Sequence, residues 1–181
     1  MPRWRAVLGV YFQGTVVALS AAANYCLPAS SATVRYPPRI RFVSQLFFTV
    51  FATFMMYDFA ILTLPTEYVA HHGVSLACHG YVAVLGTAAA FPWYVRGVGC
   101  LEAGSAMCNL SFLFEEDSRV ATAYAACMTL SNAGAVYAMR HWVHATAAHA
   151  GKALGAIVTL ALVVGRQRVA IEVVRCHSSA E

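Results

Sequence analysis

The feature that most constrains this chain is a succession of apolar segments, each about as long as a membrane-spanning helix. Hydrophobic residues make up 60% of the 181 residues, and the mean hydropathy is +0.61. Only 11% of the residues are charged, whereas a soluble domain has about 25%. Because a spanning helix needs about 20 apolar residues, there is room for roughly six. The sequence therefore predicts an all-α membrane protein, a bundle of about six transmembrane helices.

Proline, glycine and polar clusters divide the chain into its expected helices. Pro65 ends the second apolar segment, because the residue before a proline resists helical geometry. The third segment starts close to a pair of histidines and ends near "PWYVR", whose aromatic residues and arginine are typical of a membrane interface. The expected helices lie at about 6–27, 42–64, from the histidines to 91, 97–114, 120–139 and 145–165.

Four regions follow from this division. Residues 1–27 are expected to be a first membrane helix with a short basic N-terminus, although the same pattern also suits a secretory signal or an organellar presequence. Residues 28–41 form the longest loop, since their serine, proline and arginine residues cannot lie in lipid as open backbone. Residues 42–165 form the helical core, and residues 166–181 form a polar C-terminal tail.

Charge and cysteine patterns exclude several classes of protein. The net charge of +4 comes from scattered basic residues, so we expect no nucleic-acid partner. Four of the six cysteines lie inside apolar segments without metal-ligand spacing, and we interpret them as packing residues: Cys78, Cys100, Cys108 and Cys127. His141, His144 and His149 recur at about helical spacing but fall at a loop, so we expect them at the interface. We therefore predict no metal and no cofactor.

Ionisable residues within the apolar segments are the main functional signal. Each costs about 2.5–3.5 kcal/mol to insert, so it normally faces a partner or a wet cavity. Asp58 lies about 9 Å inside the end of the second segment. His71 and His72 open the third segment at the same face. His79 lies seven residues beyond His72, on about the same side and roughly 10 Å deeper. We expect Asp58 and these histidines to face one another.

A second polar stripe lies on the fourth segment. Glu102, Ser105 and Asn109 follow i, i+3, i+7 spacing and so share one helix face. Asn132 lies near the middle of the fifth segment, and Arg140 closes its far end. These positions predict a bundle with a polar centre. The alternative for Asp58 and Glu102 is that each only locks helices together by pairing with a histidine.

Three stretches resemble the TLC domain, the family named for TRAM, Lag and CLN-type proteins. "MMYDFAILTLPTEYVAHHGVSLACHGYV" is similar to its central Tyr-Asp and His-His signature. "VGCLEAGSAMCNLSFLF" resembles its Leu-Glu helix with a downstream Asn-Leu, and "NAGAVYAMRHWV" its later helix ending in Arg. The order is that of the family, and the resemblance covers about Phe42 to Val143.

The resemblance implies a barrel-like bundle of about six membrane helices around a lipid-accessible cavity. It also implies a role in lipid synthesis, in control of acyl composition, or in transport and assembly at the endoplasmic reticulum. In the ceramide synthase branch the paired histidines belong to the acyl-transfer site, which maps to His71 and His72, with Asp58 and Glu102 as supporting acids. Here "FPWYVRGVGCLE" lacks the His-Asp that precedes the Leu-Glu of synthases. The non-synthase branch is therefore the closer likeness.

These observations lead to a principal hypothesis and a rival. The first is a multi-pass TLC-type protein that binds or processes lipid or acyl chains in membrane lipid homeostasis. Its expected partners are membrane lipids and, for acyl transfer, acyl-CoA. Its expected location is the endoplasmic reticulum, with a mitochondrial or other organellar membrane as the alternative. The catalytic candidates are His72, His71 and Asp58; the substrate-binding candidates are His79, Glu102, Asn109, Asn132 and Arg140.

The rival hypothesis is a non-catalytic accessory subunit. In that case an old TLC-type bundle serves as scaffold among other membrane protein subunits, and the basic tail with Arg166, Arg168 and Arg175 grips a neighbour. The shortness of the chain and the missing synthase acids motivate this alternative.

Overall fold

The computed structural model describes residues 3–26, 38–61, 66–85, 87, 89–114, 117–146 and 149–178. In these ranges all regular secondary structure is helical, which confirms the all-α prediction with six helices. Most of the loop expected at 28–41 lies outside the described residues. The helices are α1 (Arg3–Cys26), α2 (Pro38–Ile61), α3 (Thr66–Leu85), α4 (Phe91–Ser111), α5 (Ser118–Ala145) and α6 (His149–Ser178).

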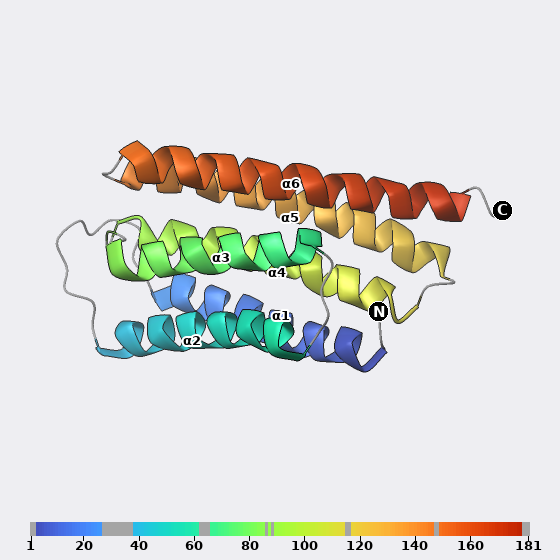
Figure 1. Cartoon of the computed structure of the whole chain (residues 1–181), viewed down its shortest axis with the longest axis horizontal. Coiled ribbons are helices and arrows are strands. Elements are labelled where there is room, and N and C mark those ends of the chain that lie inside the picture. The colour runs from blue at the N-terminus through green and yellow to red at the C-terminus, as the bar shows by residue number, and fades with distance from the viewer. Residues whose placement is uncertain are drawn as a thin grey trace.

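The six helices close into a flattened ring. The principal contacts pair α1 with α2 and α4, α5 with α4 and α6, and α3 with α2 and α6. The order around the ring is therefore α1, α2, α3, α6, α5, α4. Figure 1 shows three levels, with α1 and α2 at the bottom, α3 and α4 in the middle, and α5 and α6 at the top. Of the six interfaces, the one between α3 and α6 is the smallest.

Consecutive helices run in opposite directions, so one end of the ring gathers residues that are distant in sequence. Both chain ends lie at this end, on the right in Figure 1. It contains the first turns of α1, α3 and α5 and the last turns of α2, α4 and α6. We call it the Asp58 end, because Asp58 lies in the last turn of α2.

The helix ends differ from the expected boundaries where polar residues were interpreted as loops. The "PWYVR" stretch lies in the first turns of α4, with Pro92 at its beginning, where a proline is tolerated. Helix α5 continues to Ala145. The region expected as a polar tail continues α6 to Ser178. Polar residues do not end α6, because the side chains of Arg166 and Gln167 are hydrogen-bonded to neighbouring helices.

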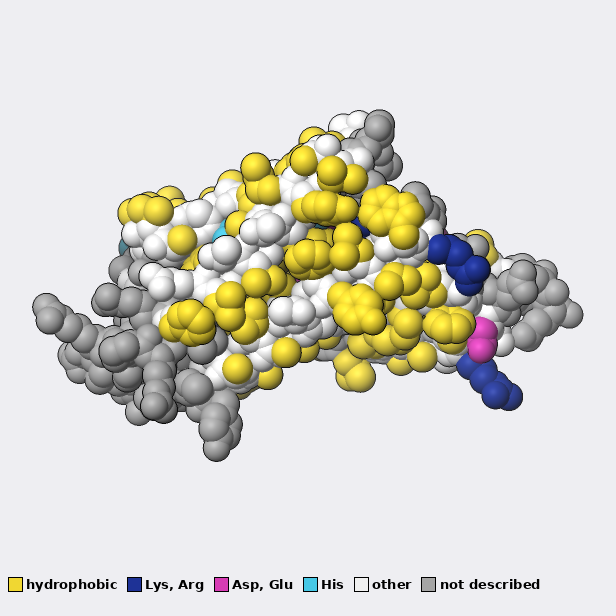
Figure 2. All heavy atoms as spheres, turned by 90° about the horizontal axis from the view of Figure 1, so that it is seen from below, with side chains coloured by type: hydrophobic (Ala, Val, Ile, Leu, Met, Phe, Trp, Pro, Cys, Tyr) yellow, Lys and Arg dark blue, Asp and Glu magenta, His cyan; other side chains and the backbone are white. Residues whose placement is uncertain are grey.

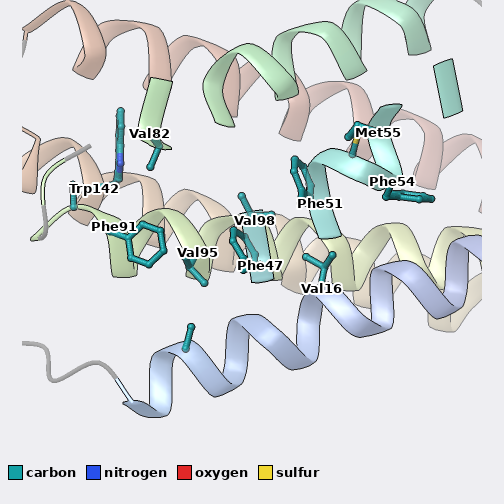
Figure 3. Close-up of a cluster of buried hydrophobic side chains, with 12 residues drawn as sticks. Val16, Phe47, Phe51, Phe54, Met55, Val82, Phe91, Val95, Val98 and Trp142 are labelled. Carbon is teal, nitrogen blue, oxygen red and sulfur yellow. The ribbon is translucent and has the colours of Figure 1, made fainter. Parts of the chain in front are cut away.

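An aromatic and aliphatic core fills the part of the ring between α1, α2 and α4. Val16, Phe47, Phe54 and Val95 are almost fully buried there. Figure 3 shows this cluster, which also reaches Val82 of α3 and Trp142 of α5. The packing of α2 against α1 and α4 therefore holds this part of the ring together by apolar burial.

The outer surface remains strongly apolar. Large hydrophobic side chains are exposed on α1, α2, α3, α5 and α6, among them Tyr11, Met56, Val84 and Leu130. On the face in Figure 2, yellow side chains dominate, and basic and acidic groups show mainly near one end. Within the described residues, two stretches are long and apolar enough to cross a membrane, Arg3–Ala23 and His149–Cys176. Helix α2 contributes a shorter apolar stretch, Gln45–Ile61, and spanning by all six helices remains a prediction.

Candidate active site and lipid cavity

Asp58 is the centre of a buried polar contact between three helices. Its Oδ2 accepts a hydrogen bond from Arg5 Nη2 of α1 and another, of 2.9 Å, from His72 Nε2 of α3. Asp58 is 1% exposed, and Arg5 and His72 are also buried. The structure thus brings Asp58 and His72 together, as their depths indicated, and adds an arginine that ion-pairs with the aspartate.

This contact is better suited to holding helices than to catalysis. The Asp58 carboxylate is engaged by two partners, because Arg5 ion-pairs with the same oxygen that His72 contacts. Neither Asp58 nor His72 is among the residues that line the interior cavity. His71, which precedes His72 on α3, does line that cavity, because adjacent residues on a helix point about 100° apart.

His79 has a structural environment. Its Nε2 donates to the carbonyl oxygen of Phe48 at 3.1 Å, since a carbonyl can only accept. Its Nδ1 then accepts the Tyr94 hydroxyl proton across 2.9 Å. Both ring nitrogens are therefore engaged, and the rings of Phe48 and Phe51 pack beside the imidazole. In this arrangement His79 connects α3 with α2 and α4.

Glu102 and Asn109 share a partner rather than contacting each other. Asn109 Nδ2 donates to Gln13 Oε1 of α1 at 2.7 Å, and Gln13 is also hydrogen-bonded to Glu102. Gly9 permits this approach of α1 to α4, because a Cβ at Gly9 would lie 2.5 Å from Asn109 Nδ2. Glu102 is 5% exposed, and its Oε2 has no hydrogen-bond partner among the described residues.

Arg166 of α6 is fixed in the interior by neutral acceptors. Its Nη1 donates to Ser105 Oγ and its Nη2 to the Leu101 carbonyl oxygen, each at 2.6 Å, and Nε donates to Asn132 Oδ1 at 3.2 Å. Gly104 leaves room for the guanidinium, because a Cβ there would lie 2.5 Å from Arg166 Nη2. Arg166 is thus a cation of the ring interior and not part of a solvated tail.

A cavity lies between α3 on one side and α4, α5 and α6 on the other. Its polar part contains His71, Ser75, Glu102 and Arg166. Among these groups, Arg166 is close enough to act electrostatically on both His71 and Glu102. Away from the Asp58 end the wall is apolar or aromatic, and includes Phe51, Val82, Trp93, Trp142, Leu154 and Val158. The cavity is therefore amphipathic along the ring axis.

The dimensions of this cavity match a hydrocarbon chain in length but not in volume. From Trp93 to Glu102 on α4 is about 14 Å at the helical rise, and from Gly151 to Arg166 on α6 about 22 Å. Half of a bilayer's hydrocarbon core is about 15 Å thick. The volume of about 110 Å³ is below the roughly 150 Å³ of a cavity that binds benzene. A whole chain therefore requires the ring to open.

The remaining predicted residues fall outside this cavity. Asn132 does not line it but orients Arg166 and donates to Gln167 Oε1 at 3.0 Å. Arg140 is exposed on α5. His141 stacks on Trp93 with ring centroids 4.2 Å apart. The part of the chain that the structure describes contains no cluster of three or more side chains suited to a metal ion.

The sequence reasoning missed Arg5, Gln13 and Arg166 as site residues. A helical stripe was available on α1, where Arg5, Gly9, Gln13 and Ser20 are spaced by four, four and seven residues and are all buried. For Arg166 the signal was the apolar run on both sides of it, from Leu160 to Val164 and again after Arg168. A charge between two apolar runs indicates a helix that continues.

Comparisons of the chain with protein-family models, with curated proteins and with solved structures find no match. The resemblance to the TLC domain therefore stays a prediction that its three sequence motifs carry.

The Arg5–Asp58–His72 contact gives a stability prediction. Asp58→Ala leaves the buried Arg5 guanidinium without a counter-charge, and such a change costs about 3–5 kcal/mol of unfolding free energy. The matched control is Met56→Ala, on the same helix but 59% exposed. Denaturant unfolding in detergent micelles measures both. A double variant, Arg5→Met with Asp58→Leu, removes both charges. Its loss of unfolding free energy should be much smaller than that of Asp58→Ala. Equal stability of Asp58→Ala and Met56→Ala would contradict this role.

Proposed function

We propose that this chain is a multi-pass membrane protein of the TLC type that binds a lipid or acyl chain within its helical ring, in membrane lipid homeostasis. The observation that carries the proposal is the amphipathic cavity, with Glu102, His71 and Arg166 toward one end and an apolar wall beyond. An acyl chain has the same division into a polar head and a hydrocarbon tail. The membrane we expect is the endoplasmic reticulum.

The outer surface supports a membrane location. A soluble monomer rarely exposes a large contiguous apolar surface. Here Tyr11 is 72% exposed, Leu130 74% and Val84 80%, on three different helices. Such side chains are stable on the outside of the ring when lipid tails surround it. The apolar stretches of α1 and α6 are long enough for that location.

The arrangement of the histidines favours lipid binding in the cavity over catalysis at Asp58. Asp58 and His72 are occupied with each other and with Arg5. The imidazole that a bound lipid would contact is that of His71. An acyl transfer from acyl-CoA would therefore use His71 as acid, base or acceptor, and His72 would position α3.

Lipid access is proposed at the seam between α3 and α6. This is the smallest interface of the ring, and both helices contribute residues to the cavity directly behind it. At the seam the Tyr81 hydroxyl approaches Gly151 so closely that a Cβ at Gly151 would collide with it. Separation of α3 from α6 would enlarge the cavity and open it sideways to the bilayer.

Filling the cavity should abolish lipid binding. Leu162 of α6 lines the cavity, whereas Leu160, two residues earlier, is 47% exposed on the outside. We expect Leu162→Trp to lose the acyl chain that co-purifies with the protein, and Leu160→Trp to retain it. Extraction and mass spectrometry of chains per mole of protein, after mild-detergent purification, measure the difference.

The same experiment distinguishes the rival accessory-subunit function. Equal lipid content in the Leu162→Trp and Leu160→Trp proteins would show that bound lipid lies outside the cavity, and would overturn the proposal. A chain recovered only at the mass of a multisubunit complex, with no lipid in the wild type, would favour the scaffold.

Locking the seam should trap the cavity in its closed form. In a background without the native cysteines, Tyr81→Cys and Gly151→Cys can be joined by a short reducible bis-thiol reagent. We expect the cross-linked protein to exchange lipid with vesicles more slowly by at least about tenfold, and reduction to restore exchange, because a closed cavity is too small for a chain. The control is the double variant treated with a monofunctional thiol reagent, because Gly151→Cys alone would place a Cβ against the Tyr81 hydroxyl. Unchanged exchange in the cross-linked protein would exclude access at this seam.

A further inference from the structure

The polar end of the cavity contains one carboxylate oxygen that the protein leaves without a partner. This inference rests on the proposed function and concerns the head group of the bound lipid. Glu102 is 5% exposed and lines the cavity, and its Oε2 has no hydrogen-bond partner among the described residues. A buried, unpaired carboxylate oxygen costs free energy. A ligand that donates a hydrogen bond to this oxygen therefore gains the most binding free energy.

The charge at this end is already balanced by the protein. Arg166 acts electrostatically on Glu102 more strongly than His72 does, and it is held in place by Ser105, Leu101 and Asn132. None of these three acceptors carries a charge, so the guanidinium charge remains available to compensate Glu102. A head group with a charge of its own would disturb this balance.

Each charged head group meets a specific penalty. A carboxylate or phosphate would bring a second negative charge beside Glu102, and an ammonium group a second positive charge beside Arg166, in surroundings where charges interact strongly. An uncharged hydroxyl meets neither penalty. It can donate to Glu102 Oε2 and accept from the imidazole N–H of His71, which lines the same part of the cavity.

The opposite orientation of the ligand is less favourable. Trp142 Nε1 is another buried polar atom of the cavity wall without a partner among the described residues. It is a neutral donor in an apolar and aromatic part of the wall. Leaving the charged Glu102 oxygen unpaired costs more free energy than leaving this neutral donor unpaired. The head group therefore goes to Glu102 and the hydrocarbon tail toward Trp142.

We propose that the cavity selects a single-chain lipid with an uncharged hydroxyl head, such as a long-chain alcohol or a monoacylglycerol. The free oxygen of Glu102 is the acceptor for that hydroxyl, and the apolar wall between α3 and α6 receives the chain.

The test compares three probes that share one chain and differ only in the head: 1-hexadecanol, palmitate and hexadecylammonium. Each is titrated at pH 8 into the full chain in mild detergent, and native mass spectrometry gives the bound fraction. We expect hexadecanol to bind at least about tenfold more tightly than either charged probe, a difference of about 1.4 kcal/mol. In Glu102→Gln the discrimination against palmitate should shrink at least threefold. The matched control is Glu172→Gln, because Glu172 is an exposed acid of α6. This variant should keep the full wild-type discrimination against palmitate.

The outcomes separate this inference from the proposed function. Palmitate or hexadecylammonium binding as tightly as hexadecanol, in a manner that Leu162→Trp abolishes, would overturn the hydroxyl preference and leave a lipid cavity. Undiminished discrimination against palmitate in Glu102→Gln would also overturn it, since Glu102 would not contact the head. No Leu162-dependent binding of any probe would overturn both.

Discussion

The structure depends on the buried contact that Arg5 and His72 make with Asp58. It joins α1, α2 and α3 at the end of the ring where both chain termini lie. Helix α3 needs this connection, because its principal neighbours are only α2 and α6 and its interface with α6 is the smallest of the ring. His79 adds a second attachment of α3, to α2 and α4. Helix α3 is therefore anchored by polar bonds on its α2 side and has only a small interface with α6.

The ring interior has a filled part and a part that leaves a cavity. Between α1, α2 and α4 it is filled by side chains such as Phe47 and Val95. Between α3 and α6 it leaves a cavity with Arg166 and Glu102 toward one end. Burial of charge is expensive, and the protein offsets it differently in the two places. Asp58 is paired directly with Arg5, whereas Glu102 has Arg166 as an electrostatic partner without a direct ion pair. Each carboxylate keeps one oxygen without a hydrogen-bond partner among the described residues. Of these two carboxylates, Glu102 lines the cavity and Asp58 does not.

From the sequence, the depth of a residue along the bundle axis could be predicted better than the direction in which its side chain points. Helical rise placed Asp58 and His72 at one level, and the structure brings them into contact. The rotation of each helix about its axis depends on packing, so the sequence could not decide which histidine faces the cavity or that Asn109 pairs with Gln13. Arg166 was missed because a charged residue after an apolar run looks like a helix end; its acceptors on α4 and α5 become visible only when the helices are placed together.

Photo-labelling with a chain probe tests the central claim most directly. A 16-carbon chain with a diazirine near its methyl end, carrying a hydroxyl or a carboxylate head, is irradiated with the protein in mild detergent, and the labelled residues are identified by peptide mass spectrometry. The account predicts labels on the apolar cavity wall, at residues such as Val82, Trp93 and Trp142, and their loss in Leu162→Trp. Labels confined to outward residues such as Leu160 and Val164, unchanged in that variant, would contradict a lipid inside the ring.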